Sequence, residues 1–420
     1  MDASPRLPDT RAAAYRLLAL LTAINLINYL DRYLLAPVVP AMRAELRISN
    51  AQAGGLVTAF FLVYMLAAPL VGWLADRYPR KYLIGGGVAL WSVATWLSGW
   101  APSYGWLLAS RALVGIGEAS YSCIVPALLC DLFPRQQRSR VLSVFYAAIP
   151  VGAALGYVIG GWVGMHFGWR SVFSVGALPG LVCSLFMLAV REPQRGAADP
   201  LTHSAPVPMR ALLRSLLRNS EYRHATLGTA FSTFALGGLA FWMPTFLTQA
   251  RGIPAVRATL LFGGFTLVNG IVANLVGGWL SDAYLRRHPG AHFVISGWGL
   301  WIGLPLAAAT IFVPLHAVLL PAAFGAEFFL FLNGGPLNAA TVNSVPAGVR
   351  SSALGINMVL IHLLGDLISP PMIGKVADLT HSLVWGVAVV LPAMALAASI
   401  TLRGASRLND RRAEPAAESR

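Results

Sequence analysis

One ten-residue phrase occurs twice in this chain, about half the chain length apart. Residues 72–81 read GWLADRYPRK and residues 278–287 read GWLSDAYLRR. Each copy follows a long apolar run, and another long run soon follows. A membrane chain built from two similar halves is the plan of a transporter that alternates access to a central site. This plan excludes most enzymes before any single side chain is considered.

The composition favours lipid rather than water as the solvent of this chain. Hydrophobic residues make up 56% of it and charged residues 11%, whereas a soluble domain usually has about 25% charged residues. So much apolar surface is stable in a bilayer. The three cysteines lie in apolar runs without ligand spacing. We therefore predict neither a disulfide framework nor a metal site, and no cofactor.

Twelve apolar runs are long enough to cross a bilayer, which takes about 20 residues. The predicted fold class is an all-α membrane protein with twelve transmembrane helices in two pseudo-symmetric six-helix bundles. The runs lie at 17–40, 51–75, 82–101, 104–131, 140–165, 170–190, 224–249, 257–281, 291–313, 315–340, 351–374 and 382–402. The predicted parts are a tail at 1–16, a bundle at 17–190, a linker at 191–223, a bundle at 224–402 and a tail at 403–420.

Lysine and arginine lie mostly on one side of these predicted spans. They concentrate in both tails, in the linker and in the loops after the even-numbered spans. Because basic loops stay in the cytoplasm, we expect both termini there and the chain in the inner membrane. The net charge of +14 reflects this bias, so nucleic acid is not an expected partner. The first residues show no cleavage signal, so the first run is expected to stay as a helix.

The linker contains a basic segment with helical periodicity. Arg210, Arg214 and Arg218 recur every four residues, with leucines between them. This pattern predicts a short amphipathic helix on the inner leaflet. A solvated linker that only carries the positive-inside bias is the alternative.

The repeated phrase predicts a gate on the cytoplasmic side. Its glycines allow close helix approach, and its acids and bases can pair in one state and separate in another. The predicted gating residues are Asp76, Arg77, Arg80, Lys81, Asp282, Arg286 and Arg287. Alternatively, the basic residues only set topology. The phrase resembles the signature loop of the major facilitator superfamily, and the twelve-span layout resembles that superfamily over nearly the whole chain.

Span 5 also resembles a superfamily motif. Gly152, Gly156, Gly160 and Gly161 match the antiporter signature G-x-x-x-G-P-x-x-G-G, but Tyr157 replaces its proline. The alternative is that these glycines form only a packing face between helices.

Charged residues inside the predicted spans are the functional candidates. Each costs at least ~2.5–3.5 kcal/mol at mid-bilayer, so it must be paired, face water or be neutral. In spans 1 and 4 the sequence places Asp31, Arg32, Arg111 and Glu118. We predict a four-member cluster in which carboxyl protonation frees an arginine to bind an anionic headgroup. A static staple between two helices is the alternative.

Two further candidates lie in the second half. Glu327 stands among phenylalanines in span 10, and either a substrate or proton role or a hydrogen-bonded structural role is open. His362 and Asp366 form an i, i+4 pair in span 11. Such a pair can respond to pH near neutrality, whereas a packed structural pair is the alternative.

Several blocks resemble the Spinster branch of the superfamily. They read NYLDRY at 28–33, GIGEASYS at 115–122, FYAAIPVG at 145–152, GAEFFLFLN at 325–333 and HLLGD at 362–366. The resemblance implies a proton-linked carrier of lysolipids or sphingolipids such as sphingosine 1-phosphate. It implies protonation acids at Asp31 and Glu118, a partner arginine at Arg32, a span-4 arginine at Arg111 and a histidine at His362.

The sequence thus predicts a monomeric, proton-coupled carrier of amphiphilic anions, and not an enzyme. The predicted proton-coupling residues are Asp31, Glu118, His362 and Asp366. The predicted substrate-binding residues are Arg32, Arg111, Tyr121, Phe241, Trp242, Glu327 and Asn333. One alternative is a proton-coupled carrier of drugs or small organic anions. A more distant alternative is an intramembrane lipid-modifying enzyme, but the sequence shows no nucleophile–base or metal-ligand pattern that would support it.

Overall fold

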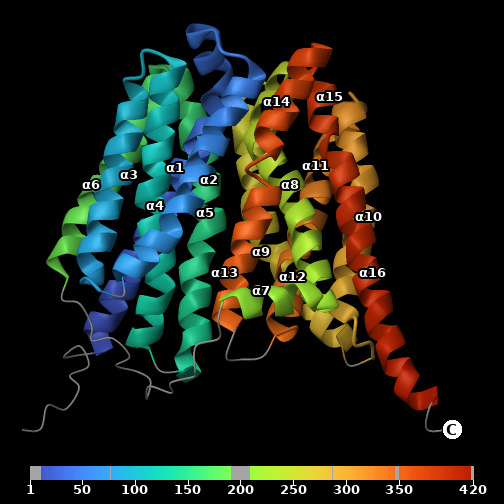
Figure 1. Ribbon diagram of the computed structural model, residues 1–420. Helices are drawn as coiled ribbons and strands as arrows, with labels where there is room; N and C mark the ends of the chain where they lie inside the picture. The colour runs from blue at the N-terminus through green and yellow to red at the C-terminus, as the bar shows by residue number, and fades with distance from the viewer. Residues whose placement is uncertain are drawn as a thin grey trace, which may run out of the picture. The chain divides into compact units, whose positions relative to one another are not determined.

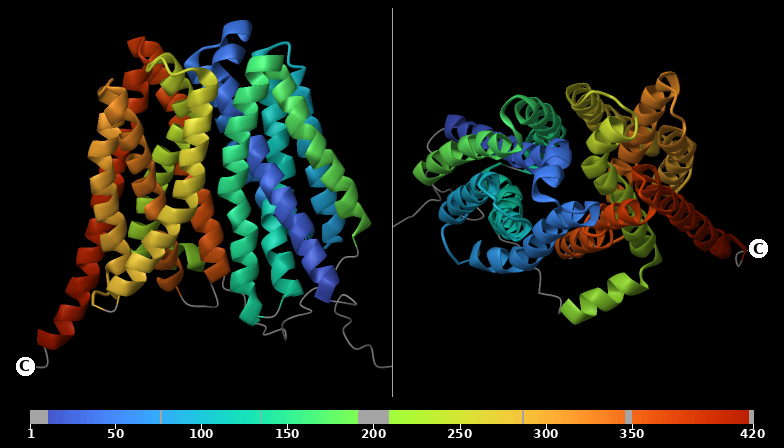
Figure 2. Two further views of the ribbon diagram at one scale, coloured as in Figure 1. Left: turned by 180° about the vertical axis from the view of Figure 1, so that it is seen from behind. Right: turned by 90° about the horizontal axis from the view of Figure 1, so that it is seen from above.

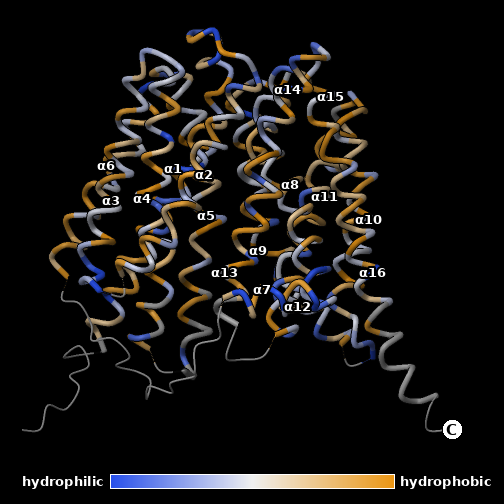
Figure 3. The backbone as a smooth tube through the Cα atoms, viewed as in Figure 1, coloured by the Kyte–Doolittle hydropathy of each residue, from blue (hydrophilic) through white to orange (hydrophobic). Residues whose placement is uncertain are grey.

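The computed structural model describes residues 11–75, 77–133, 135–190, 209–285, 287–345 and 350–417. Within these ranges the regular elements are all α-helices (Figure 1). Ten segments of the described chain are long and apolar enough to cross a membrane. The predicted all-α membrane class is therefore confirmed. Hydrophobic residues run along the long helices, and hydrophilic ones gather toward many helix ends and at α7 (Figure 3).

In the first half of the chain, each predicted span is one helix. These helices are α1 (Arg11–Leu46), α2 (Asn50–Ala75), α3 (Arg80–Gly99), α4 (Tyr104–Leu132), α5 (Arg135–Phe167) and α6 (Trp169–Ala189). Of these, α3 and α4 are not among the ten segments that are long and apolar enough to cross a membrane by composition alone. Glycine, serine and tryptophan lower the hydropathy of both helices, and α4 also carries Arg111 and Glu118.

In the second half, three predicted spans are each broken into two helices. Spans 7 to 9 are α8 (Ser220–Gln249), α9 (Ala255–Leu285) and α10 (Ala291–Phe312). The broken spans are α11 (His316–Leu332) with α12 (Gly334–Asn343), α13 (Arg350–Leu364) with α14 (Ser369–Thr380), and α15 (Leu383–Ala388) with α16 (Val390–Ala417). The linker contains α7 (Met209–Arg218), which runs crosswise to the long helices of its unit (Figures 1 and 2).

The chain divides into two compact units. The first consists of Met1–His203 with Ile253–Gly264, and the second of Ser204–Gly252 with Phe265–Arg420. The linker helix α7 therefore belongs to the second unit, and the first part of α9 clusters with the first.

Glycines allow the close packing of α5 on α1 in the first unit. A Cβ atom added to Gly152 would lie 2.4 Å from the carbonyl oxygen of Leu26. One added to Gly156 would lie 2.5 Å from the carbonyl oxygen of Leu30. These distances leave no room for a side chain, so the glycine face of α5 is a helix-packing face. Tyr157, at the position of the motif's proline, is fully buried between the rings of Tyr33 and Phe262.

In the second unit, α8 packs against α16 and α13, and α10 packs against α11 and α16. Close approach again depends on glycine where α8 meets the break between α13 and α14. A Cβ atom on Gly237 would lie 2.4 Å from the Cβ atom of Asp366, and one on Gly365 would lie 3.0 Å from the carbonyl oxygen of Ala230.

Candidate functional site

The first unit contains a buried ion pair between α1 and α4. The Arg32 guanidinium donates from Nη2 to Oε2 of Glu118. The glutamate side chain is fully buried, whereas 18% of the arginine side chain is exposed. The guanidinium also lies 4.8 Å from the centroid of the Tyr29 ring and 4.9 Å from that of Phe60. Arg32 is therefore the more exposed member of the pair, and its guanidinium lies close to aromatic rings.

Asp31 and Arg111 are connected through a residue of α3. The Thr95 hydroxyl donates to Asp31 Oδ2 at 2.5 Å and accepts from Arg111 Nη2 at 3.3 Å. All three side chains are buried. Asp31 Oδ1 and Arg111 Nε have no hydrogen-bond partner among the described residues. The arrangement leaves one oxygen of a buried acid available for a proton or for a new partner.

The structure thus brings all four predicted residues of spans 1 and 4 close together. Hydrogen bonds join them as two pairs, and Asp31 also interacts electrostatically with Arg32 and Glu118 of the other pair. Sequence reasoning missed Thr95, which joins one of the pairs. Thr95 is hard to distinguish in the sequence from Ser92 and Ser98, which are small hydroxyl residues of the same helix. Both serines donate to backbone carbonyls of their own helix, so a hydroxyl in this span does not by itself indicate a charged partner.

Tyr121, a predicted substrate-binding residue, is buried between α4 and α1. Its side chain is 1% exposed, and its hydroxyl donates to the backbone carbonyl of Leu21 in α1. Its ring contacts Trp91 edge-on, with the centroids 5.7 Å apart. In this state Tyr121 connects α4 to α1, and a direct role in substrate binding stays a prediction.

Glu327 of α11 has two partners on α9. The Thr266 hydroxyl donates to Oε1 at 2.7 Å, and the Asn269 amide donates to Oε2 at 3.3 Å and to the carbonyl of Phe324 at 3.1 Å. Glu327 is 6% exposed. Both side-chain donors to Glu327 are neutral, whereas Glu118 of the first unit accepts from an arginine. Neither partner was predicted, because hydroxyls and amides in a span do not reveal which helix they face.

His362 and Asp366 are in contact, at the end of α13. Nδ1 of the histidine lies 2.9 Å from Oδ1 and 3.1 Å from Oδ2 of the aspartate. The pair stands where the helix of span 11 is interrupted between Leu364 and Ser369. Interrupted helices within a span are typical of binding sites in transporters.

The other predicted binding residues of the second unit are buried in its core. Trp242 is fully buried and donates from Nε1 to the carbonyl of Pro370 at 2.9 Å, with the Phe241 ring packed against it edge-on. Asn333 stands between α11 and α12 and donates to the carbonyl of Leu330 at 2.5 Å. These contacts are structural, and contact with a substrate stays a prediction.

The repeated phrase forms an ion pair that sequence reasoning did not identify. Arg80 donates from Nη1 to Oδ2 of Asp131, at the end of α4, at 2.6 Å. Arg77 instead contacts Trp73 of its own segment, with the guanidinium 4.0 Å from the ring centroid, and Lys81 lies near the Tyr82 ring. In the second copy, Asp282 and Arg287 are exposed. Asp76 and Arg286 lie outside the described residues.

No group of three or more His, Cys, Asp or Glu residues in the described chain is placed to hold a metal ion.

Comparison with known proteins identifies similar sequences and folds. The sequence model of the Major Facilitator Superfamily matches residues 21–370. Over 388 residues the chain is 37% identical to human protein spinster homolog 1, an alignment that covers 86% of this chain and 72% of the human protein. It is 34% identical to protein spinster of Drosophila melanogaster, covering 89% of this chain and 63% of the longer fly protein.

Two solved structures share the fold at lower sequence identity. A bacterial homologue of the human lysosomal transporter Spinster, in an inward-facing and occupied conformation, has a TM-score of 0.83 at 22% identity and covers 95% of this chain and 98% of its own. A D-xylose–proton symporter has a TM-score of 0.71 at 19% identity, covering 92% and 97%.

Proposed function

The chain belongs to the Spinster branch of the major facilitator superfamily and is a membrane transporter, and from this premise we propose that it moves amphiphilic anionic lipids by proton-coupled alternating access. The proposed substrates are lysophospholipids or molecules like sphingosine 1-phosphate. The proposed setting is the inner membrane, with both termini cytoplasmic and the chain acting as a monomer.

One observation carries this proposal: the Arg32–Glu118 pair has a fully buried acid and a partly exposed base. In a low-dielectric site the pair is stable only while both members are charged. Protonation of Glu118 removes its attraction for Arg32, and the guanidinium then needs another anion. A phosphate or carboxylate headgroup provides two acceptor oxygens in the geometry that guanidinium prefers. Proton uptake and headgroup binding are therefore coupled at one side chain.

The surroundings of the pair suit an amphiphile. Rings of Tyr29, Phe60 and Phe61 face the Arg32 guanidinium, so a headgroup bound there meets apolar surface within a few ångströms. Asp31, linked to Arg111 through Thr95, supplies a second acid that can hold a proton while Glu118 is ionised. Glu327 and the His362–Asp366 pair supply further titratable groups in the second unit.

Flux of a labelled lysophospholipid into proteoliposomes, with and without a pH gradient, tests the proposal. We expect the gradient to accelerate flux in the wild type and to lose this effect in Asp31→Asn and Glu118→Gln. Glu45→Gln is the matched control, because Glu45 pairs with Trp169 and Arg170 outside the site, and it should keep the gradient response. Unchanged gradient-driven flux in Asp31→Asn would refute the coupling role. If small organic anions compete better than lysolipids, the carrier serves that other substrate class.

A further inference from the structure

The linker helix α7 has three faces, and packing explains only one of them. Leu212 and Leu216, each 3% exposed, are buried against the second unit. The next face along the circumference is apolar and exposed, and consists of Met209, Leu213 and Leu217, with exposed fractions of 58%, 40% and 66%. Beside it lies a basic face of three exposed arginines, Arg210, Arg214 and Arg218.

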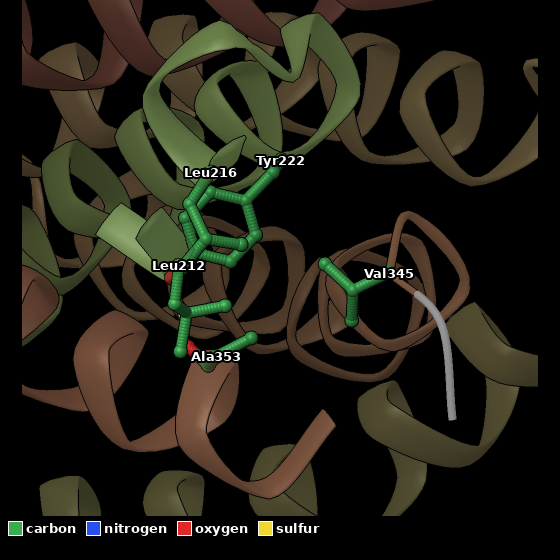
Figure 4. Close-up of a cluster of buried hydrophobic side chains, with 5 residues drawn as sticks. All are labelled: Leu212, Leu216, Tyr222, Val345 and Ala353. Atoms are coloured by element: carbon green, nitrogen blue, oxygen red, sulfur yellow. The ribbon is translucent and has the colours of Figure 1, made fainter. Parts of the chain in front are cut away.

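The buried face fixes α7 to the junction between α12 and α13. Leu212 and Leu216 form a cluster with Tyr222, Val345 and Ala353 (Figure 4). The Tyr222 hydroxyl donates to the carbonyl of Ala353 at 2.8 Å. Val345 follows α12 and Ala353 belongs to the first turn of α13, so α7 contacts the chain on both sides of this junction.

The turn between α7 and α8 is equally well defined. Asn219 accepts from the backbone N–H of Tyr222 at 3.1 Å, which caps the first turn of α8, and its amide donates to the carbonyl of Ser344 at 2.6 Å. The membrane span of α8 begins at Ser220, directly after α7. Because α7 runs crosswise to the long helices of its unit (Figure 2) and directly precedes the span of α8, we infer that it lies along the membrane boundary.

Both unexplained faces match the chemistry of this boundary. The exposed apolar residues and the arginines each recur every four residues, and each apolar residue directly precedes an arginine. The two stripes therefore run side by side along the helix. Water solvates the arginine stripe but not the apolar one. A bilayer surface presents acyl chains next to phosphates, and anionic headgroups complement the three positive charges.

We propose that α7 is a binding site for anionic phospholipid, in which Arg210, Arg214 and Arg218 contact headgroup phosphates while Met209, Leu213 and Leu217 enter the acyl boundary. Through its buried face, the lipid-bound helix holds the α12–α13 junction at the membrane surface. The helix that begins there, α13, carries the His362–Asp366 pair. This inference does not depend on the identity of the transported substrate.

Retention of lipid by the full-length chain tests this site directly. The protein is purified from nanodiscs containing phosphatidylcholine with or without phosphatidylglycerol, and bound lipid is counted by native mass spectrometry. Each arginine near an anionic surface adds up to about fivefold in affinity. The triple variant Arg210→Gln, Arg214→Gln, Arg218→Gln should therefore lose most of the phosphatidylglycerol that the wild type retains. Phosphatidylcholine retention should stay the same.

A charge-preserving control separates electrostatics from folding. The triple variant Arg210→Lys, Arg214→Lys, Arg218→Lys keeps the three positive charges and should retain phosphatidylglycerol. An environment-sensitive fluorophore at Leu217→Cys, in a background with all three native cysteines replaced by alanine, should report an apolar environment only in the discs with phosphatidylglycerol. Equal phosphatidylglycerol retention in the wild type and the glutamine variant would overturn the proposal. The proposal would also be overturned if a bound protein, rather than lipid, made the environment of the fluorophore apolar.

Discussion

The Thr95 hydroxyl is the smallest group on which the buried charges of the first unit depend. One oxygen donates to Asp31 and accepts from Arg111. Removing that hydroxyl would leave a buried acid and a buried guanidinium each short of a partner. Such unsatisfied groups cost about 1–3 kcal/mol, and more when they are charged.

We therefore expect Thr95→Val, which keeps the shape of the side chain, to lower the free energy of unfolding by about 1–3 kcal/mol. Thermal unfolding of the purified protein in detergent would measure this loss. Thr95→Ser retains the hydroxyl and is the control, expected to lie close to the wild type. A valine variant as stable as the serine variant would show that the Thr95 hydrogen bonds do not contribute to the free energy of unfolding.

At the residue scale, the charges were predictable and their partners were not. Asp31, Arg32, Arg111 and Glu118 stand out because a charge in a span is costly. Thr95 does not stand out, nor do Thr266 and Asn269, which hold Glu327. Uncharged polar residues are tolerated in a span, and the sequence does not determine which side of a helix faces which neighbour.

At the scale of the element, the contact between α1 and α5 depends on the absence of side chains. A Cβ atom on Gly156 would lie 2.5 Å from the carbonyl oxygen of Leu30, whereas one on Gly86 of α3 would meet nothing within 4 Å. The two positions form a matched pair, since both are glycines inside membrane helices.

Gly156→Ala should destabilise the protein by about 1–3 kcal/mol, because the backbones of α1 and α5 must move apart. Gly86→Ala should be neutral or stabilising by up to about 1 kcal/mol, as expected for alanine in a helix interior. Unfolding temperatures of both variants, measured in the same detergent, decide the comparison. If both variants had the same unfolding temperature, the close approach of α1 and α5 at Gly156 would not determine the stability of the protein.

The docking of α7 provides another matched pair. Leu216 is 3% exposed and Leu217 is 66% exposed. Leu216→Ala should cost about 2–5 kcal/mol as a buried truncation, whereas Leu217→Ala should change stability in detergent by no more than about 0.5 kcal/mol. Limited proteolysis of the linker offers a direct readout, with faster cleavage expected for the alanine at 216. Equal cleavage rates would contradict the docking.

The elements themselves were largely predictable from the sequence. Each of the twelve predicted runs coincides with a helix or with a pair of helices, because hydrophobic length is a strong signal. The interruptions near Asn333, between Leu364 and Ser369, and at Val389 were not predicted. Glycines and prolines occur throughout these spans, so their presence alone does not mark where a helix stops. The basic helix of the linker was predicted, but its packing partner was not.

At the scale of the whole molecule, the repeated phrase is where the gating hypothesis can be tested. In the first copy Arg80 pairs with Asp131 of α4 at 2.6 Å, and both side chains are mostly buried. In the second copy Asp282 and Arg287 are exposed. Among the described residues of the two copies, Arg80 of the first thus provides the ion pair with Asp131, and the gating prediction rests on this pair.

If this pair closes a gate, Asp131→Asn and Arg80→Gln should each change the transport rate several-fold, since coupling energies of 1–3 kcal/mol correspond to about 5–150-fold. The double variant Arg80→Asp with Asp131→Arg restores the attraction with the charges exchanged, and it should recover part of the wild-type rate in proteoliposomes. A charge exchange that is no better than the single variants would mean that the residues contribute only to topology.

The interrupted helices are unequally distributed between the two units. In the first unit each span is one helix, whereas in the second unit three successive spans are each interrupted once within the described residues. A rod transmits a displacement along its whole axis, but a hinged helix can tilt one segment while the other stays seated. Asn333 and Val389 keep helical dihedral angles, so the interruption that can act as a hinge is the 365–368 turn beside the His362–Asp366 pair.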